Sequence, residues 1–135
     1  MANVTTNTRL IAGTRRVVQY VAVDSDGTEE TDLVLYDSSA VATALGIVDP
    51  LTCTLVSIKA VVNATSAARV ELQFDATTDI LAMALPAESD IDLNFRDIGG
   101  LKNPAGTGIT GDITLTTAGL GAGDNIIIIL EVRPD

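Results

Sequence analysis

The sequence predicts an all-β protein: a single-domain antiparallel β-sandwich of jelly-roll type, with about eight strands and one short helix. Residues 126–130 are consecutive apolar side chains, and the first four are isoleucine. Residues 69–75 alternate strictly between polar and apolar side chains, and clusters of Gly, Pro, Asp and Ser separate short strand-like segments. Strands do not alternate with long helical segments, which argues against a parallel α/β sheet.

The isoleucine segment is expected to be a central, buried strand. β-branched side chains favour a strand over a helix. Successive side chains of a strand point to opposite faces, so Ile126, Ile128 and Leu130 share one face while Ile127 and Ile129 share the other. A sandwich covers only one face of each sheet. The helical segment, a loop or a second subunit must then cover Ile127 and Ile129, and we favour the subunit.

The chain divides into an N-terminal arm, residues 1–10, and a β-sandwich domain, residues 11–135. The arm is rich in Thr and Asn and has no hydrophobic period, so it is expected to be a mobile tail or to lie on a neighbouring molecule. Further strands are predicted at residues 14–24, 33–36, 51–63, 68–75, 80–85, 91–95 and 113–117. The first two would form a hairpin around the turn at residues 25–28, with Glu29 and Glu30 at its tip.

Local signals support the remaining elements. A helix is predicted over residues 40–45, because Ser38 and Ser39 can cap its first amides and Gly46 can end it. In residues 68–75 the apolar side chains occupy one face and the polar ones the other, which is typical of an antiparallel sheet with one solvated side. Pro86 closes the strand at residues 80–85. Residues 97–108 are rich in Gly and are predicted to be a surface loop rather than part of a sheet.

Composition excludes several classes of function. The formal charge is −10, and no basic stripe is present, so a nucleic-acid partner is not expected. The chain has no histidine, which removes Ser-His-Asp and Cys-His catalysts and histidine-based metal sites. The N-terminus lacks the apolar core of a secretory signal, and no apolar run approaches the ~20 residues of a membrane helix. We expect no membrane partner.

Candidate chemical sites are few, and each has a simpler structural explanation. Cys53 lies in an apolar run, where a buried inert thiol is expected. Residues 24–32 contain several carboxylates that could ligate calcium, but a hairpin turn with an acidic tip is the simpler explanation. A second set of carboxylates could act as acid and base in a hydrolase, although turns and solvated strand faces account for them. That set comprises Asp75, Asp79, Glu88, Asp90 and Asp92.

Four segments resemble small virion structural proteins of tailed bacteriophages: MANVTTNTR at 1–9, DGTEETDLVLYDSS at 26–39, FRDIGGL at 95–101 and LEVRP at 130–134. The resemblance implies a capsid decoration, or cement, protein. Such a protein is small and β-rich, often a homotrimer, and binds the outside of a lattice of major capsid protein. It would be made in the host cytoplasm and reside on the capsid surface of the virion. The resemblance carries no catalytic residue and no cofactor.

Three groups of residues are the candidate contacts of such a protein. Ile127 and Ile129 would meet another subunit, and the arm or the Gly-rich loop would meet the capsid. The candidates in those two segments are Asn3, Val4, Thr5, Leu101, Lys102 and Asn103. Two alternatives remain open: a tail or head-to-tail structural subunit, which would assemble as rings or tubes, and a carbohydrate-binding receptor-recognition sandwich, which would need exposed aromatic rings or a calcium site.

Overall fold

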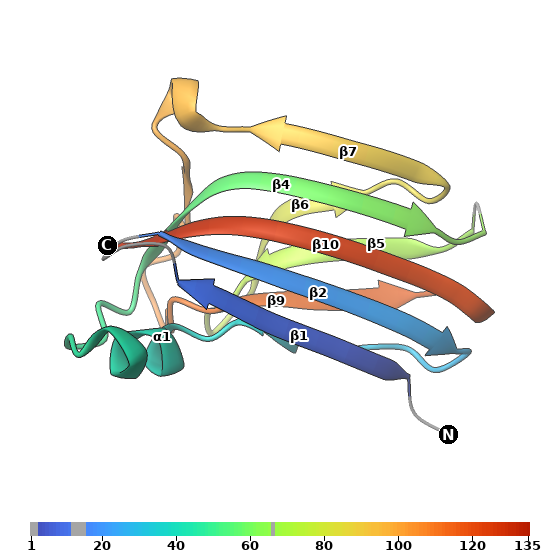
Figure 1. Ribbon diagram of the computed structural model, residues 1–135, viewed down its shortest axis with the longest axis horizontal. Coiled ribbons are helices and arrows are strands. Elements are labelled where there is room, and N and C mark those ends of the chain that lie inside the picture. The colour runs from blue at the N-terminus through green and yellow to red at the C-terminus, as the bar shows by residue number, and fades with distance from the viewer. Residues whose placement is uncertain (1–2, 12–15, 66) are drawn as a thin grey trace.

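The computed structural model describes residues 3–11, 16–65 and 67–135, and these form ten strands, one α-helix and one 3-10 helix (Figure 1). The elements are β1 (Val4–Ile11), β2 (Val17–Asp26), β3 (Leu33–Tyr36), α1 (Ser38–Leu45), β4 (Cys53–Asn63), β5 (Arg69–Phe74), β6 (Ile80–Leu85), β7 (Ser89–Asn94), η1 (Arg96–Ile98), β8 (Leu101–Lys102), β9 (Ile113–Ala118) and β10 (Ala122–Pro134). Residues 1 and 2 of the expected arm, and residues 14 and 15 of the first expected strand, lie outside the described residues.

The strands form two antiparallel sheets. Sheet A has the order β1-β2-β10-β4-β7, with β8 beside β4, and sheet B has the order β3-β9-β5-β6. Four antiparallel strand pairs enclose one another in chain order. From the outermost to the innermost they are β2 with β10, β3 with β9, β4 with β7, and β5 with β6. Successive pairs lie in alternate sheets, which is the arrangement of a jelly roll. The predicted all-β sandwich of jelly-roll type is therefore confirmed, with two strands more than expected.

The isoleucine strand β10 is the centre of sheet A, as predicted. Residues 125–132 pair with β2 on one side and with β4 on the other. Ile126, Ile128 and Leu130 point toward sheet B and are completely buried. From sheet B, Leu72 and Leu115 meet them in one aliphatic core. In Figure 1 sheet A lies in front, with β10 in red at its middle and sheet B behind it.

Helix α1 was predicted correctly, but its N-cap was not. Asp37, rather than Ser38 or Ser39, caps the helix, and its Oδ1 accepts a hydrogen bond from the amide of Ala40 at 3.2 Å. A carboxylate at this position satisfies an otherwise unpaired helical amide. Gly46 ends the helix with φ of 70°, in the left-handed region that glycine adopts without strain, as expected.

The expected N-terminal arm is an edge strand instead of a tail. Val4–Ile11 pairs with β2 along its whole length, and every one of its side chains is exposed. Asn3 Nδ2 donates to the carbonyl of Thr28 at 2.9 Å, and Asn7 Nδ2 donates to the carbonyl of Leu35 at 3.2 Å. An edge strand that is exposed on both faces needs no apolar side, so its sequence carried no strand signal.

The predicted hairpin of residues 19–36 is wrong, because β2 and β3 lie in different sheets. Residues 27–32 cross between the sheets and are held against the end of β9. The amide of Glu30 donates to Thr117 Oγ1 at 2.9 Å, and the amide of Leu120 donates to Glu29 Oε1 at 2.9 Å. The two glutamates therefore fasten a crossover rather than decorate a hairpin tip.

The predicted loop at residues 97–108 also needs correction. It begins with the end of η1, and Leu101 and Lys102 form β8, which pairs with Leu55 and Thr54 of β4. Leu101 packs against the core. A two-residue strand is too short to produce a recognisable alternation, so only its pairing with β4 reveals it.

Candidate functional site

The most distinctive surface is the outer face of sheet A, the side that points away from sheet B. Strand pairing places its side chains in rows across five strands. The Ile129 row contains Thr8, Tyr20, Ile129, Lys59 and Asp92, and the Ile127 row contains Thr6, Ala22, Ile127, Val61 and Asp90. No register irregularity falls within these two rows. The face is therefore a regular grid whose order follows from the pairing alone.

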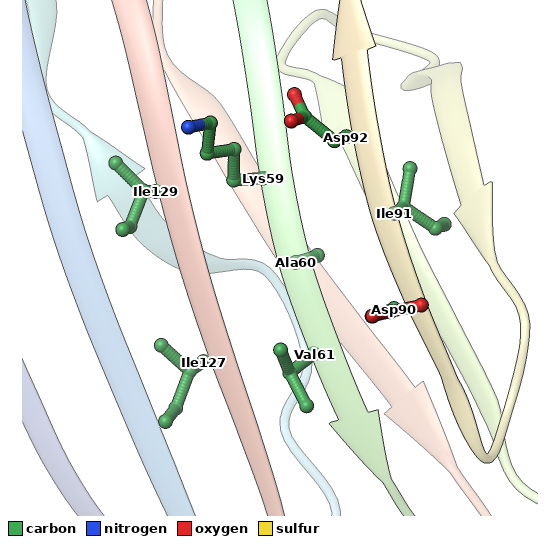
Figure 2. A pocket seen from close by; sticks show the side chains of 8 residues that line it. All are labelled: Lys59, Ala60, Val61, Asp90, Ile91, Asp92, Ile127 and Ile129. Atoms are coloured by element: carbon green, nitrogen blue, oxygen red, sulfur yellow. The ribbon is translucent and has the colours of Figure 1, made fainter.

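The middle of this grid is apolar and open to solvent. Val61 is 48% exposed, Tyr20 38% and Ile127 36%, and Leu10 at one corner is 62% exposed. A shallow hollow of about 290 Å³ lies over β10, β4 and β7, with Ile127, Ile129 and Val61 at its floor (Figure 2). Contiguous exposed apolar side chains of this kind mark interaction surfaces in soluble proteins.

Within the Ile129 and Ile127 rows, the charged groups lie at one flank. Lys59 stands on β4 next to the apolar centre, and Asp90 and Asp92 stand on the edge strand β7 (Figure 2). The opposite edge strand, β1, carries the hydroxyl groups of Thr6 and Thr8. The face thus runs from a hydroxyl edge, across an apolar centre, to an acidic edge.

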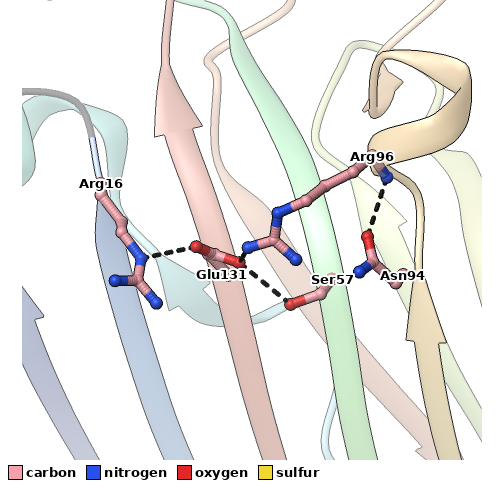
Figure 3. Close-up of polar contacts among 5 residues, drawn as sticks. All are labelled: Arg16, Ser57, Asn94, Arg96 and Glu131. Atoms are coloured by element: carbon pink, nitrogen blue, oxygen red, sulfur yellow. Dashed lines mark hydrogen bonds and ion pairs between the residues drawn. The ribbon is translucent and has the colours of Figure 1, made fainter.

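One end of the face is closed by a buried carboxylate. Glu131 follows Ile129 on the same side of β10, and its side chain is only 11% exposed. Arg16 Nε lies 2.5 Å from Glu131 Oε1, Arg96 Nη2 pairs with Oε2, and Ser57 Oγ donates to Oε2 at 3.4 Å (Figure 3). The cluster joins four segments that are distant in sequence.

The ionisation of Glu131 reflects opposing effects. Burial by itself raises the pKa of a carboxyl group, but the hydrogen bond from Arg16 and the charge of Arg96 outweigh it and hold the pKa of Glu131 below its usual value. The carboxylate therefore stays ionised at neutral pH. With both arginines paired to it, the cluster acts as a structural fastening rather than as an anion site.

The predicted contact residues do not form one surface. Ile127 and Ile129 lie on the outer face of sheet A, and Val4 lies at one corner of it, opposite Asp24. Thr5 pairs with the buried Val23 and so points the other way, and Asn3 reaches back to the crossover. The structure brings together only three of the eight candidates.

The candidates of the Gly-rich segment lie elsewhere. Leu101 is partly buried, and Asn103 Nδ2 donates to the carbonyl of Asp75 at 3.3 Å. Lys102 is exposed, with its Nζ 3.8 Å from Asp135 Oδ1. Of this trio, Lys102 offers the most exposed side chain to a partner.

Sequence reasoning missed most of the outer face. Tyr20, Lys59 and Val61 fall within predicted strands, but no neighbours across the sheet were predicted for them. Asp90 and Asp92 were considered among five carboxylates that a hydrolase, turns or solvated strand faces could explain. The alternation within each strand could have placed them on a face. Only the cross-strand register shows that they flank Ile127 and Ile129.

The thiol of Cys53 and the hydroxyl of Tyr36 are both buried, and neither is a reactive group. Cys53 is buried, as predicted, and burial together with the charges of Asp135 and Asp112 raises the pKa of its thiol to about 12. Burial also raises the pKa of Tyr36, whose hydroxyl has no hydrogen-bond partner among the described residues. Both groups are protonated at neutral pH, so neither is an activated nucleophile.

The acidic segments have structural partners. Asp75 Oδ2 accepts from Thr110 Oγ1 at 2.6 Å, Asp79 Oδ1 accepts from the amide of Ala76 at 3.2 Å, and Glu29 binds Leu120 as described above. Within residues 3–11, 16–65 and 67–135, no group of three or more His, Cys, Asp or Glu side chains is arranged to hold a metal ion. The calcium interpretation of residues 24–32 gains no support from this geometry.

None of the helices in the described part of the chain has the length and apolarity needed to cross a bilayer. Comparison of the chain with protein-family models, with curated proteins and with solved structures gave no match in any of the three.

Proposed function

We propose that this chain is a non-enzymatic structural protein of a bacteriophage virion, a decoration subunit that binds the outside of the capsid and stabilises the head. The observation that carries the proposal is the exposed apolar outer face of sheet A on an otherwise acidic chain. Such a face suits a protein that works by burying surface against other subunits. The resemblance of four segments to virion structural proteins supplies the class of assembly.

The jelly roll is compatible with this role but does not establish it, because the same fold serves viral capsids, lectins and cupins. Among the four aromatic side chains, Tyr20 is exposed, Phe95 is partly buried, and Tyr36 and Phe74 are buried. A sugar platform usually needs more than one exposed ring, so this arrangement favours a protein partner over a glycan.

The direct test is co-sedimentation of the purified protein with undecorated shells of the phage that encodes it. Saturable binding at a fixed number of copies per shell supports the proposal. Rings or tubes formed by the protein alone would point to a tail or head-to-tail subunit, and glycan binding with no affinity for shells would point to receptor recognition. Either of those outcomes would overturn a decoration role.

Two variants locate the capsid contact. Lys102→Glu reverses an exposed charge beside the Gly-rich segment, and Val4→Asp places a charge on the exposed edge strand. We propose that loss of shell occupancy in one variant and not the other identifies which end of the sandwich meets the capsid. Deleting residues 1–8 is a poorer test, because it would also remove most of a strand that pairs with β2.

A further inference from the structure

The order of hydroxyl, apolar and acidic side chains across the outer face of sheet A makes this face complementary to a second copy of itself. Consider a twofold axis in the plane of contact, running along β10. Rotation about it places β10 over β10, β2 over β4, and β1 over β7, while each row stays at its own height. We infer that a second copy of this chain packs on this face in an isologous, sheet-on-sheet pair.

The Ile129 row shows the match most clearly. Across the axis Ile129 meets Ile129, and Tyr20 of each copy lies over Lys59 of the other. An ammonium group over an aromatic face is attracted by the ring. At the edges, the hydroxyl of Thr8 reaches the carboxylate of Asp92 in the other copy.

The Ile127 row repeats this pattern with apolar partners. Ile127 meets Ile127, Ala22 lies over Val61, and Thr6 reaches Asp90. The hydroxyl edge of each copy thus covers the acidic edge of the other at both ends of both rows. The contact ends at the Glu131 row, where Arg16 and Arg96 already cover the carboxylate.

Electrostatics favours this axis over a twofold axis that lies in the same plane but runs perpendicular to the strands. A twofold axis perpendicular to the strands would place β7 over β7, so that Asp90 and Asp92 would meet the same residues of the partner. Like charges placed opposite each other disfavour an interface. The axis along β10 instead separates the two acidic edges.

The size of the face fits a stable pair. Five strands about 4.8 Å apart span about 19 Å, and the face extends about 20 Å along the strands, from the row of Asn125 to the row of Glu131. With side-chain margins, the face covers roughly 600–800 Å², close to the ~800 Å² that each partner contributes to a standard interface. Two sheets packed in this way keep their strands within about 30° of each other.

The test uses residues 8 and 92, because within one chain they lie on strands separated by β2, β10 and β4. That separation is about 19 Å, well beyond the screening length of about 8 Å at physiological salt. Any coupling between the two positions must therefore arise between copies. Thr8→Lys should tighten the dimer by about tenfold and Thr8→Asp should weaken it by about tenfold, since the contact occurs twice.

In an Asp92→Asn background both changes at position 8 should lose most of their effect. Thr5→Lys and Thr5→Asp are matched controls: they make the same charge changes on the same strand, but on its opposite face, and should leave the dimer constant unaltered. Sedimentation equilibrium measures all of these constants. The wild-type chain should have twice its 14.0 kDa mass, and Ile129→Asp should be a folded monomer.

A wild-type monomer or trimer, effects at position 8 that do not depend on Asp92, or a dimer that survives in a folded Ile129→Asp variant would each overturn the pairing. Should Ile129→Asp fail to fold, the position-8 cycle still decides, because Thr8 is exposed on an edge strand. The inference goes beyond the proposed function and shares with it only the exposed outer face of sheet A. Shell binding by a monomeric variant would leave the decoration role intact, whereas a dimer that binds no shell would leave only the pairing.

Discussion

The two faces of β10 carry the same residue type, but one is buried and the other is partly exposed to solvent. Ile126 and Ile128 are completely buried between the sheets, whereas Ile127 is 36% exposed and Ile129 is partly exposed on the outer face. One strand therefore supplies both the core of the sandwich and the centre of an exposed apolar surface. The core of one chain uses only one of these two apolar faces, so the apolar content of β10 exceeds what folding of one chain requires. Four predictions test how sharply the two roles separate.

The largest expected effect is on the inner face. Ile128→Ala removes a fully buried side chain and leaves a cavity, so the free energy of unfolding should fall by about 3 kcal/mol. Urea denaturation followed by circular dichroism measures this. It should be carried out in the Thr8→Asp background at a fixed protein concentration, because self-association adds to apparent stability. A loss below about 1 kcal/mol would mean that the inner face is not the dominant core.

Glu131 is the exception on the outer face, because it is expected to matter for folding. Glu131→Gln removes the charge between Arg16 and Arg96 and should lower the free energy of unfolding by about 1 kcal/mol at neutral pH. The pKa of Glu131 is held low in the folded protein, so its contribution is present above the usual glutamate pKa and is lost as the pH falls through the folded value.

Wild type and Glu131→Gln should therefore converge in stability below about pH 4, and their denaturation midpoints across a pH series check this. A constant difference at all pH values would show that the arginine cluster contributes nothing through charge. Thr8→Asp should again be present in both proteins, because it weakens self-association.

The matched change on the outer face should be mild. Ile127→Ala removes the same atoms as Ile128→Ala, but from a partly exposed site, so in the Thr8→Asp background the free energy of unfolding should fall by about 1 kcal/mol or less. In the wild-type background the same substitution should weaken the dimer. Equal destabilisation by Ile127→Ala and Ile128→Ala would remove the distinction between the two faces.

The smallest effect, with the opposite sign of pH dependence, is expected at Asp112. Burial raises the pKa of this carboxyl group, although the amide of Ser38 donates to its Oδ1 at 2.8 Å. A raised pKa means that the folded protein binds the proton more readily than the unfolded chain, so stability falls as the pH rises through that range. Asp112→Asn should be as stable as wild type or slightly more so at neutral pH, and thermal denaturation at pH 5 and pH 7 measures this. Marked destabilisation by this substitution would contradict it.

Local sequence patterns were sufficient for much of the fold. Alternation in residues 69–75 and the isoleucine run identified β5 and β10, and Gly46 marked the end of α1. Elements without an apolar side were missed or misassigned. β1 is exposed on both faces, and β8 has only two residues, so neither carries a period that a sequence pattern can reveal.

The candidate site was predicted only in part, because a local sequence pattern describes one strand and not its neighbours in the sheet. Ile127 and Ile129 follow directly from the alternation within one strand. Their neighbours Tyr20, Lys59 and Asp92 come from three other strands, and no local pattern states which residue of one strand lies beside which residue of another.

By itself the sequence determined the fold class, the central strand and its two apolar faces, because side-chain alternation and turn residues act over a few neighbouring positions. Only the tertiary structure decided which sheet each strand joins. It placed β2 and β3 in different layers, made an edge strand of the N-terminal segment, and aligned a hydroxyl edge, an apolar centre and an acidic edge across sheet A. Those choices depend on pairing between strands that are distant in the chain, where hydrogen-bond register and core packing select one arrangement.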